Sequence, residues 1–379
     1  MTVPPDLPAA RPADRVTEAG ADAGGPARTM RCVVVSADSI DVITAPVPRP
    51  GPAEALVRST VAGVCGSDTH AAHGRHPWIS LPYRPGHEVV GVVEQVGVDV
   101  ASFGPGRRVT VEPDLPCWEC KMCTSGRENV CEKLVFFGCG WNQGGMADYF
   151  TIAANRLHAV PDDLDDATAA LIEPLSTPVH AVRLAGVGVL PTGRADQGIA
   201  GRTVAVLGAG TIGLLVLSVL KVYGAGRVVV TDVLASKRDR AWALGADAVV
   251  DAADPNVVDR VRAELGQSAD VVFDCVAVES TIGQAVGMAG KGGTVVVVGV
   301  PTGDVTVPLQ VLQDQEIRIQ GSATYLPDDF AESVRLLQSG AVRAADFVTA
   351  TLPVADVARA FALSGGSDHV KVLVSFDAA

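Results

Sequence analysis

Apolar residues follow two different patterns along this chain, and the change between them predicts two domains. Between Met30 and about Val100, short apolar or alternating runs are separated by proline and glycine, which is typical of β-strands. After about residue 201, strand patterns alternate with helix patterns. The successive runs are 203–207, 212–223, 227–231, 236–244, 248–250, 257–265, 271–276, 280–288 and 294–300. Such alternation indicates a parallel sheet with crossover helices.

The flanking segments complete the predicted layout. A helix is expected over 165–184, where acidic residues occupy the first turn, and two more over 328–339 and 354–363, followed by a closing strand over 371–376. Residues 186–201 form a connector rich in glycine, proline and polar residues. Residues 1–28 are rich in proline, alanine, aspartate and glycine, and we expect a disordered tail.

Composition supports an α/β protein with two domains. The chain has 379 residues, which exceeds the size at which single cores usually stop growing. Hydrophobic residues make up 48 % but aromatic residues only 4 %, which suits parallel strands covered by helices.

The net charge of -13 argues against binding to nucleic acid or to anionic membranes. No signal-peptide-like segment or membrane-length apolar run is visible, so we expect a cytoplasmic protein.

Four of the eight cysteines lie within fifteen residues and predict a metal site. Cys117, Cys120, Cys123 and Cys131 have the spacing C-x2-C-x2-C-x7-C, which brings four thiolates together for a tetrahedral zinc. Two disulfides, ordinary buried cysteines and an iron–sulfur cluster are the alternatives. Because protein ligands would fill all four positions, this zinc is expected to be structural.

A glycine-rich turn after an apolar strand predicts a dinucleotide site. Gly208, Gly210 and Gly213 form G-x-G-x-x-G between a strand and a helix, and Asp232 ends the next strand. We expect the helix N-terminus to hold the phosphates and Asp232 to bind the adenosine ribose, which favours NAD over NADP. Lys237 and the following arginine weaken that preference.

A second group of metal-ligand residue types is spread over three motifs. The stretch Cys65-Gly-Ser-Asp-Thr-His70 is followed by Gly86-His87-Glu88 and, much later, by Glu173-Pro174. A thiolate, an imidazole and two carboxylates could therefore converge on a zinc that keeps an open position for chemistry.

Together these motifs resemble the zinc-dependent medium-chain dehydrogenase/reductases, in order and over the chain from about Met30 onward. The resemblance implies a GroES-like β-barrel catalytic domain from residues 29–178 and 325–379, with the zinc lobe at 113–131. It also implies a Rossmann doubly wound coenzyme domain over 179–324.

The resemblance assigns roles within the motifs. Cys65 and His87 are implied as ligands of the catalytic zinc, and either Glu88 or Glu173 as the third. Ser67 and His70 are implied as a proton relay, with the zinc acting as a Lewis acid. Asp68 is expected to accept a hydrogen bond from His87, or else only to cap a helix. The coenzyme contacts are expected to include Ile212, Lys237, Val298 and Val300.

Glu173-Pro174-Leu175 resembles the sorbitol, butanediol and threonine dehydrogenase branches of the family. Sorbitol dehydrogenases tend to have an arginine where Thr324 stands, and its absence favours a shorter diol. We expect hydride transfer between NAD and a secondary alcohol or ketone of a small diol or polyol. Threonine dehydrogenase activity and a non-catalytic NAD-binding role are the alternatives. The resemblance also implies a homodimer or homotetramer.

Overall fold

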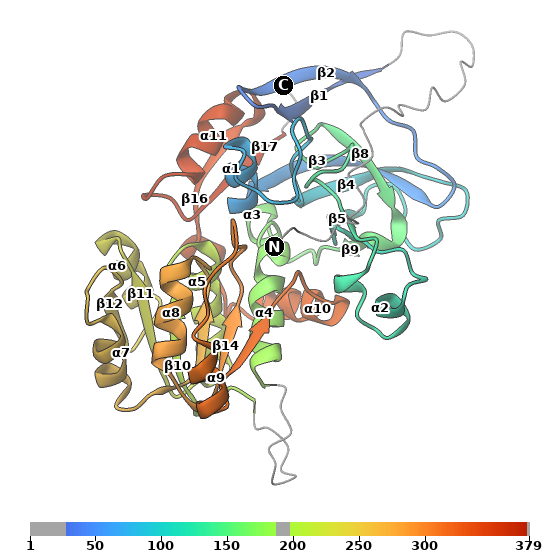
Figure 1. Cartoon of the computed structure of the whole chain (residues 1–379). Helices are drawn as coiled ribbons and strands as arrows, with labels where there is room; N and C mark the ends of the chain where they lie inside the picture. The colour runs from blue at the N-terminus through green and yellow to red at the C-terminus, as the bar shows by residue number, and fades with distance from the viewer. Residues whose placement is uncertain (1–27, 187–197, 377–379) are drawn as a thin grey trace.

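The computed structural model describes residues 28–186 and 198–376, which fold around two large sheets (Figure 1). Residues 1–27 and 187–197 lie outside this range, so the predicted disorder of the tail and most of the connector remain untested. Among the described residues, no helix combines the length and the apolar character that crossing a membrane requires.

The first large sheet is built from both ends of the chain. Its strands follow the order β16-β17-β3-β4-β5-β9, and β8 also pairs with β3. The bounds are β3 Glu54–Val64, β4 Glu88–Val96, β5 Arg108–Val111, β8 Tyr149–Ala153, β9 Leu157–Ala159, β16 Val348–Pro353 and β17 Lys371–Ser375. Because the last strand, β17, pairs antiparallel with β3, the final segment completes the N-terminal domain, as the GroES-like fold requires.

Two smaller strand pairs flank this sheet. The pair β1 (Thr29–Val35) and β2 (Ile40–Pro46) is antiparallel, and the pair β6 (Asp114–Leu115) and β7 (Val135–Phe136) lies at the base of the cysteine lobe. The lobe itself contains the short helix α2 (Lys121–Thr124) and the 3-10 turn η1 (Glu128–Val130).

The second sheet is parallel and has six strands in the order β12-β11-β10-β13-β14-β15. The bounds are β10 Thr203–Leu207, β11 Arg227–Asp232, β12 Ala248–Asp251, β13 Ala269–Asp274, β14 Ala289–Val297 and β15 Arg318–Gly321. This is the strand order of the Rossmann fold, and it places the point at which the strand order reverses between β10 and β13. The predicted α/β class with a doubly wound sheet is confirmed.

Helices surround the parallel sheet and fill the junction between the two sheets. They are α1 Gly66–Ala72, α3 Asp166–Ala169, α4 Ile172–Gly186, α5 Thr211–Val222, α6 Ala235–Ala243, α7 Val257–Leu265, α8 Glu279–Met288, α9 Leu309–Gln315, α10 Pro327–Gln338 and α11 Val357–Ser364. The remaining 3-10 turns are η2 Ala154–Arg156, η3 Ala344–Asp346 and η4 Val354–Asp356. Helix α4 runs between the sheets beside α10 (Figure 1).

The structure differs from the sequence prediction at α4. The helix expected over 165–184 is divided into α3 and α4, because the chain changes direction after the short first helix, whose N-cap is Asp165. The domain boundary expected after residue 178 falls within α4, at Pro178. Most of α4 is buried, and its apolar residues join the core of the Rossmann sheet. The proposed domain boundaries stay predictions.

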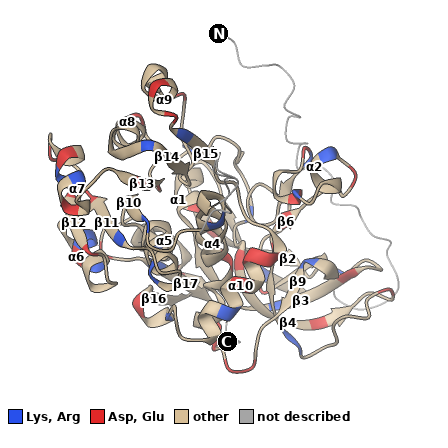
Figure 2. Cartoon of the chain, turned by 90° about the horizontal axis from the view of Figure 1, so that it is seen from below, with Lys and Arg blue, Asp and Glu red and all other residues tan. Residues whose placement is uncertain are grey.

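Acidic and basic residues alternate over the helices of the coenzyme domain. Figure 2 shows red and blue segments interspersed along α6 and α7. The expectation, drawn from the net charge, that the chain binds neither nucleic acid nor anionic membranes stays a prediction.

Candidate active site and metal centres

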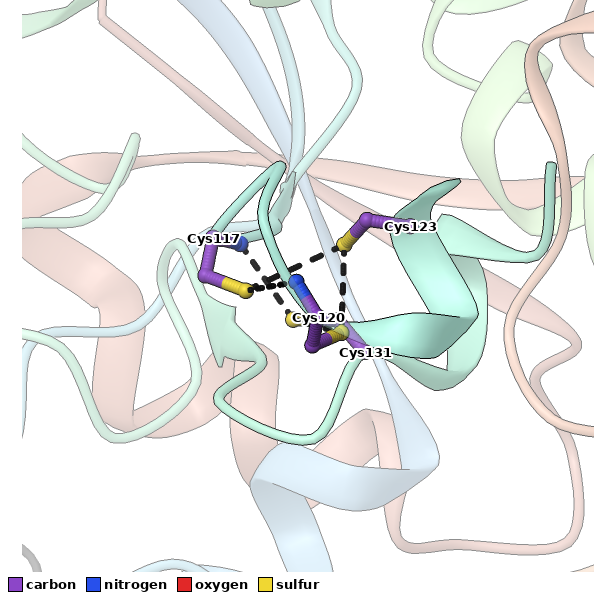
Figure 3. Close-up of side chains that lie close together, drawn as sticks. All are labelled: Cys117, Cys120, Cys123 and Cys131. Atoms are coloured by element: carbon purple, nitrogen blue, oxygen red, sulfur yellow. Dashed lines mark hydrogen bonds between the residues drawn. The ribbon is translucent and has the colours of Figure 1, made fainter. Parts of the chain in front are cut away.

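The four cysteines of the lobe point toward a common centre (Figure 3). The sulfur–sulfur distances are 4.0 Å from Cys117 to Cys123, 3.5 Å from Cys120 to Cys123 and 3.8 Å from Cys120 to Cys131. Four sulfurs at a zinc–sulfur distance of about 2.3 Å would be about 3.8 Å apart. All four are free cysteines rather than disulfides, so the residues fit a tetrahedral zinc.

Backbone N–H groups support these sulfurs. The N–H of Cys117 and that of Lys133 donate to Sγ of Cys131, at 3.2 and 3.3 Å, and the N–H of Cys120 donates to Sγ of Cys117 at 3.4 Å. Such donors stabilise thiolates, which are the form that binds a metal. The lobe can therefore hold a zinc with no open coordination position.

A second metal-ligand cluster lies where β3 and β4 meet. Cys65, at the N-cap of α1, His87 and Glu88 have ligand atoms that all lie within 4.8 Å of one another. The backbone of Gly63 leaves the room for this carboxylate, since a Cβ there would lie 1.9 Å from Oε2 of Glu88. Three of the predicted catalytic zinc ligands are thus brought together, although their metal role stays a prediction.

Glu88 has a partner that the sequence analysis missed. Nζ of Lys371 lies 2.6 Å from both carboxylate oxygens of Glu88, and it also donates to the carbonyl of Val64 at 3.2 Å. Both charged side chains are almost completely buried. Nothing in the sequence pattern pointed to this pair, because the two residues are 283 positions apart.

Glu173 lies in the first turn of α4 and is also buried. Its Oε1 accepts a hydrogen bond from the hydroxyl of Tyr325 at 2.8 Å. Burial, together with the nearby charge of Glu88, raises the pKa of Glu173 to about 7, against the opposing influence of His87 and Lys371. The structure therefore places Glu173 beside the cluster, with a partner other than Lys371.

The charges of this centre match a divalent cation. When ionised, Cys65, Glu88 and Glu173 carry three negative charges, whereas Lys371 supplies one positive charge. Burial alone would lower the pKa of His87, but Cys65 and the neighbouring carboxylates raise it well above its ordinary value. The surplus is one negative charge when His87 is protonated and two when His87 is neutral, as a metal ligand must be. Such a buried surplus is costly without a cation, so the residues fit a zinc ion.

The two relay residues lie on one face of α1. Ser67 is partly buried, and His70 is exposed and three residues further along the helix, so the two side chains lie on the same side. Burial, followed by the charges of Arg75 and His73, lowers the pKa of His70. The imidazole is therefore neutral near pH 7 and able to accept a proton.

Asp68 has a different role from the first one that we expected. Its Oδ1 accepts from the hydroxyl of Tyr83 at 2.8 Å, and its Oδ2 accepts from the backbone N–H of Cys65 at 3.1 Å. Nδ1 of His87 faces the carbonyl of Gly138 instead, at 3.5 Å. Asp68 thus supports the first turn of α1 and holds the backbone of its N-cap residue Cys65, and among the described residues no hydrogen bond joins it to His87.

The glycine-rich turn lies at the carboxyl end of β10. Gly208 has a φ of +90°, which only glycine adopts easily. A Cβ at Gly213 would lie 1.8 Å from the carbonyl oxygen of Gly208, so this glycine permits the close packing of α5 on the turn. Gly210, at the N-cap of α5, has open space at its Cβ position. Ile212 follows, partly buried in the first turn.

The other predicted coenzyme residues lie at the same edge of the sheet. Asp232 ends β11 and accepts from the backbone N–H groups of Ala209 and Leu234, at 2.8 and 2.9 Å. Lys237 is partly buried on α6, and Val298 and Val300 follow β14, the first buried and the second partly exposed. The carboxyl ends of β10, β11 and β14 thus form one candidate dinucleotide site.

Two family models match the chain. The alcohol dehydrogenase GroES-like domain matches residues 51–162, and the zinc-binding dehydrogenase model matches residues 211–339. The sorbitol dehydrogenase of Ovis aries is 33 % identical over 337 residues, which cover 88 % of this chain and 92 % of the sheep protein. The chain belongs to the zinc-dependent medium-chain dehydrogenase/reductase family. Its membership, inferred from the motifs, is confirmed.

Solved structures of relatives agree with this assignment. A zinc-binding dehydrogenase from Sinorhizobium meliloti 1021, bound to NADP, has a TM-score of 0.82, is 31 % identical and covers 92 % of this chain and 100 % of its own. The 2R,3R-butanediol dehydrogenase of Bacillus subtilis has a TM-score of 0.82 and is 27 % identical, with the same coverage of both chains. The chain is therefore an alcohol or polyol oxidoreductase, with zinc and a nicotinamide adenine dinucleotide as cofactors.

One buried carboxylate of this dehydrogenase was not singled out from the sequence. Asp114 in β6 is 1 % exposed, and neither of its oxygens has a hydrogen-bond partner of good geometry among the described residues. Burial, together with the charges of Glu112 and Glu173, raises its pKa to about 8, against the opposing influence of Thr324 and Arg156. The carboxyl group is therefore protonated in the folded chain well above its ordinary pKa.

Replacing Asp114 by asparagine is expected to stabilise the protein at alkaline pH. In the unfolded chain this carboxyl group ionises near pH 4, whereas in the folded chain it ionises near pH 8, so wild-type stability falls as the pH rises between these values. Asp114→Asn removes that loss, and thermal unfolding should show a Tm gain of about 2–5 °C at pH 8. A gain of equal size near pH 4 would contradict the explanation. Asp99→Asn, at an exposed position, is the control.

Proposed function

We propose that this dehydrogenase oxidises a secondary hydroxyl group of a small diol or polyol with NAD, or reduces the matching ketone. The observation that carries the proposal is the buried cluster of Cys65, His87 and Glu88 beside the relay residues Ser67 and His70. The similarity to a sorbitol dehydrogenase and to a butanediol dehydrogenase supports the substrate class.

The chain's own residues have defined tasks in this reaction. A zinc held by Cys65, His87 and a carboxylate would supply Lewis-acid chemistry at the substrate oxygen. The Ser67 hydroxyl, two residues after Cys65 in the first turn of α1, would take the proton of the reacting hydroxyl, and the neutral imidazole of His70 would pass that proton to solvent. Lys371 neutralises Glu88, so that the site does not repel the developing negative charge of the substrate oxygen.

Thr324 supports a substrate shorter than a hexitol. Its hydroxyl donates to the carbonyl of Asn129 at 3.3 Å, so it faces the cysteine lobe. No cationic side chain stands at this position to hold a distant hydroxyl or a carboxylate, which also argues against threonine.

A substrate panel tests the proposal. Wild-type enzyme with zinc and NAD is assayed with 2,3-butanediol, xylitol, sorbitol, threonine, 2-butanol and ethanol. We expect the highest kcat/KM of the panel for 2,3-butanediol, xylitol or sorbitol. A preference for ethanol would contradict the diol assignment, a preference for threonine would favour the amino-acid branch, and no turnover of any alcohol would favour a binding role. The predicted homodimer or homotetramer is tested separately by light scattering.

Asp232 is expected to give a preference for NADH over NADPH. Its carboxylate at the end of β11 would accept hydrogen bonds from the ribose and repel a 2′-phosphate. Asp232→Ser should lower the ratio of kcat/KM for NADH to that for NADPH by about 10- to 100-fold, since hydrogen bonds to charged groups contribute about 1.5–3 kcal/mol each. Asp239→Ser, at an exposed position on α6, should leave the ratio unchanged. A wild type that prefers NADPH would contradict the proposed role.

A further inference from the structure

Asn129 links the cysteine lobe to a segment that is far away in sequence. It lies in η1, two residues before Cys131, and is buried, although it is not a metal ligand. Its Nδ2 donates to the carbonyl of Ala323 at 2.9 Å, and its own carbonyl accepts from Oγ1 of Thr324 at 3.3 Å. The lobe therefore holds residues 323 and 324 through one side chain and one backbone group.

The same segment is held from its other side by α4 and α10. Nδ1 of His180 lies 2.7 Å from Oδ2 of Asp329, which also accepts the backbone N–H of Leu326 at 2.8 Å. Nε2 of His180 lies 3.4 Å from Nδ2 of Asn129, which closes the network. The residues before and after position 325 are thus fixed by separate partners.

The backbone at this point needs such support. Thr324 has a φ of +44°, in the left-handed region that costs a non-glycine residue about 1–2 kcal/mol. That conformation orients the next residue, Tyr325, whose side chain is fully buried and donates to Oε1 of Glu173 at 2.8 Å. The hydrogen bonds of Asn129 to residues 323 and 324, the backbone from there to Tyr325, and the Tyr325–Glu173 hydrogen bond therefore connect the cysteine lobe to the carboxylate beside the catalytic cluster.

We propose that Asn129 is a positioning residue, through which the zinc-bound cysteine lobe fixes Tyr325 and, with it, the Glu173 carboxylate at the catalytic metal centre. The lobe then controls turnover as well as stability. This inference rests on the proposed place of Glu173 in the catalytic site. The lobe has no open coordination position for chemistry, but through Asn129 it would hold the Glu173 carboxylate in place. The cysteine spacing alone does not show this role.

The test compares Asn129→Ala, Tyr325→Phe and the double variant with wild type, each as the zinc-loaded full chain. Asn256→Ala is the matched control, because this asparagine is exposed and its side chain makes no capping hydrogen bond. We expect Asn129→Ala to keep two zincs per chain and the wild-type KM for NAD, and to lower kcat about 10-fold, as is usual for groups that orient metal ligands. The double variant should be no slower than the slower single variant, because both substitutions act through Glu173.

A spectroscopic measurement makes the test independent of turnover. With cobalt substituted for zinc at the catalytic centre, Asn129→Ala and Tyr325→Phe should shift the visible absorption bands in the same way, whereas Asn256→Ala should leave them unchanged. Kinetic effects that multiply in the double variant, or a wild-type cobalt spectrum in Asn129→Ala, would overturn the inference. If Tyr325→Phe itself changed neither kcat nor the spectrum, the assignment of Glu173 to the site would be the part that is wrong.

Discussion

Replacing Cys65 by alanine is expected to abolish the catalytic zinc and to lower kcat by about a thousand-fold or more. Cys65 is the only thiol of the cluster that it forms with His87 and Glu88 in the described part of the chain. A Lewis acid contributes several kcal/mol to catalysis, and each 1.36 kcal/mol corresponds to a factor of ten in rate. Metal analysis should find one zinc per chain in Cys65→Ala and two in wild type, since the lobe cysteines are untouched.

The control for this experiment is Cys275→Ala, which removes a free thiol of the coenzyme domain outside both cysteine clusters. It should keep two zincs and wild-type turnover. If Cys65→Ala also kept two zincs, or if it lost less than about tenfold in kcat, Cys65 would not be a ligand of the catalytic metal.

Replacing Lys371 by methionine is expected to destabilise the zinc-free protein by about 3–5 kcal/mol, because it leaves the buried Glu88 carboxylate without a partner. Denaturant unfolding measures the loss. The double variant Glu88→Gln with Lys371→Met should recover most of it, since neither charge then remains. Lys133→Met removes an exposed ion pair with Glu119 and should change stability by less than about 1 kcal/mol.

Adding zinc to the Lys371→Met variant decides between the two carboxylates. Zinc stabilises both wild type and the variant, because the lobe cysteines bind it in each. If Glu88 becomes a better ligand once Lys371 is gone, the stabilisation by zinc should be larger in Lys371→Met than in wild type. Equal stabilisation by zinc in the two proteins would favour Glu173 as the carboxylate ligand. Equal stability of Lys371→Met and wild type in the zinc-free state would contradict the importance of the ion pair itself.

The sequence predicted the Rossmann sheet well because its strands are short apolar runs between turns. The runs 203–207 and 257–265 coincide with β10 and α7. Two elements were not predicted: α9, which contains no buried residue, and β15, an edge strand in which partly buried and exposed residues alternate. Neither segment has the apolar periodicity on which the prediction depended.

The candidate site was predictable where neighbouring residues form motifs and unpredictable where distant residues meet. The cysteine spacing and the motifs around Cys65 and His87 are local, and the structure brings the four lobe cysteines together and places Cys65 beside His87 and Glu88. Lys371 and Asn129 lie 283 and 194 positions from the groups they bind, and no local pattern marks them. Asp68 was assigned to His87 through resemblance, whereas its short side chain reaches back to the N-cap of its own helix, where it accepts from the backbone N–H of Cys65.

Helix α4 connects the candidate metal centre to the coenzyme domain. Its first turn carries Glu173, and near its last turn the carbonyl of Leu184 accepts from Arg318 of β15. Glu88 belongs to β4 and is anchored by Lys371 of β17, both in the other sheet. The two carboxylates are therefore held by different parts of the fold, so a substitution that displaces α4 would move Glu173 and leave the ion pair between Glu88 and Lys371 in place.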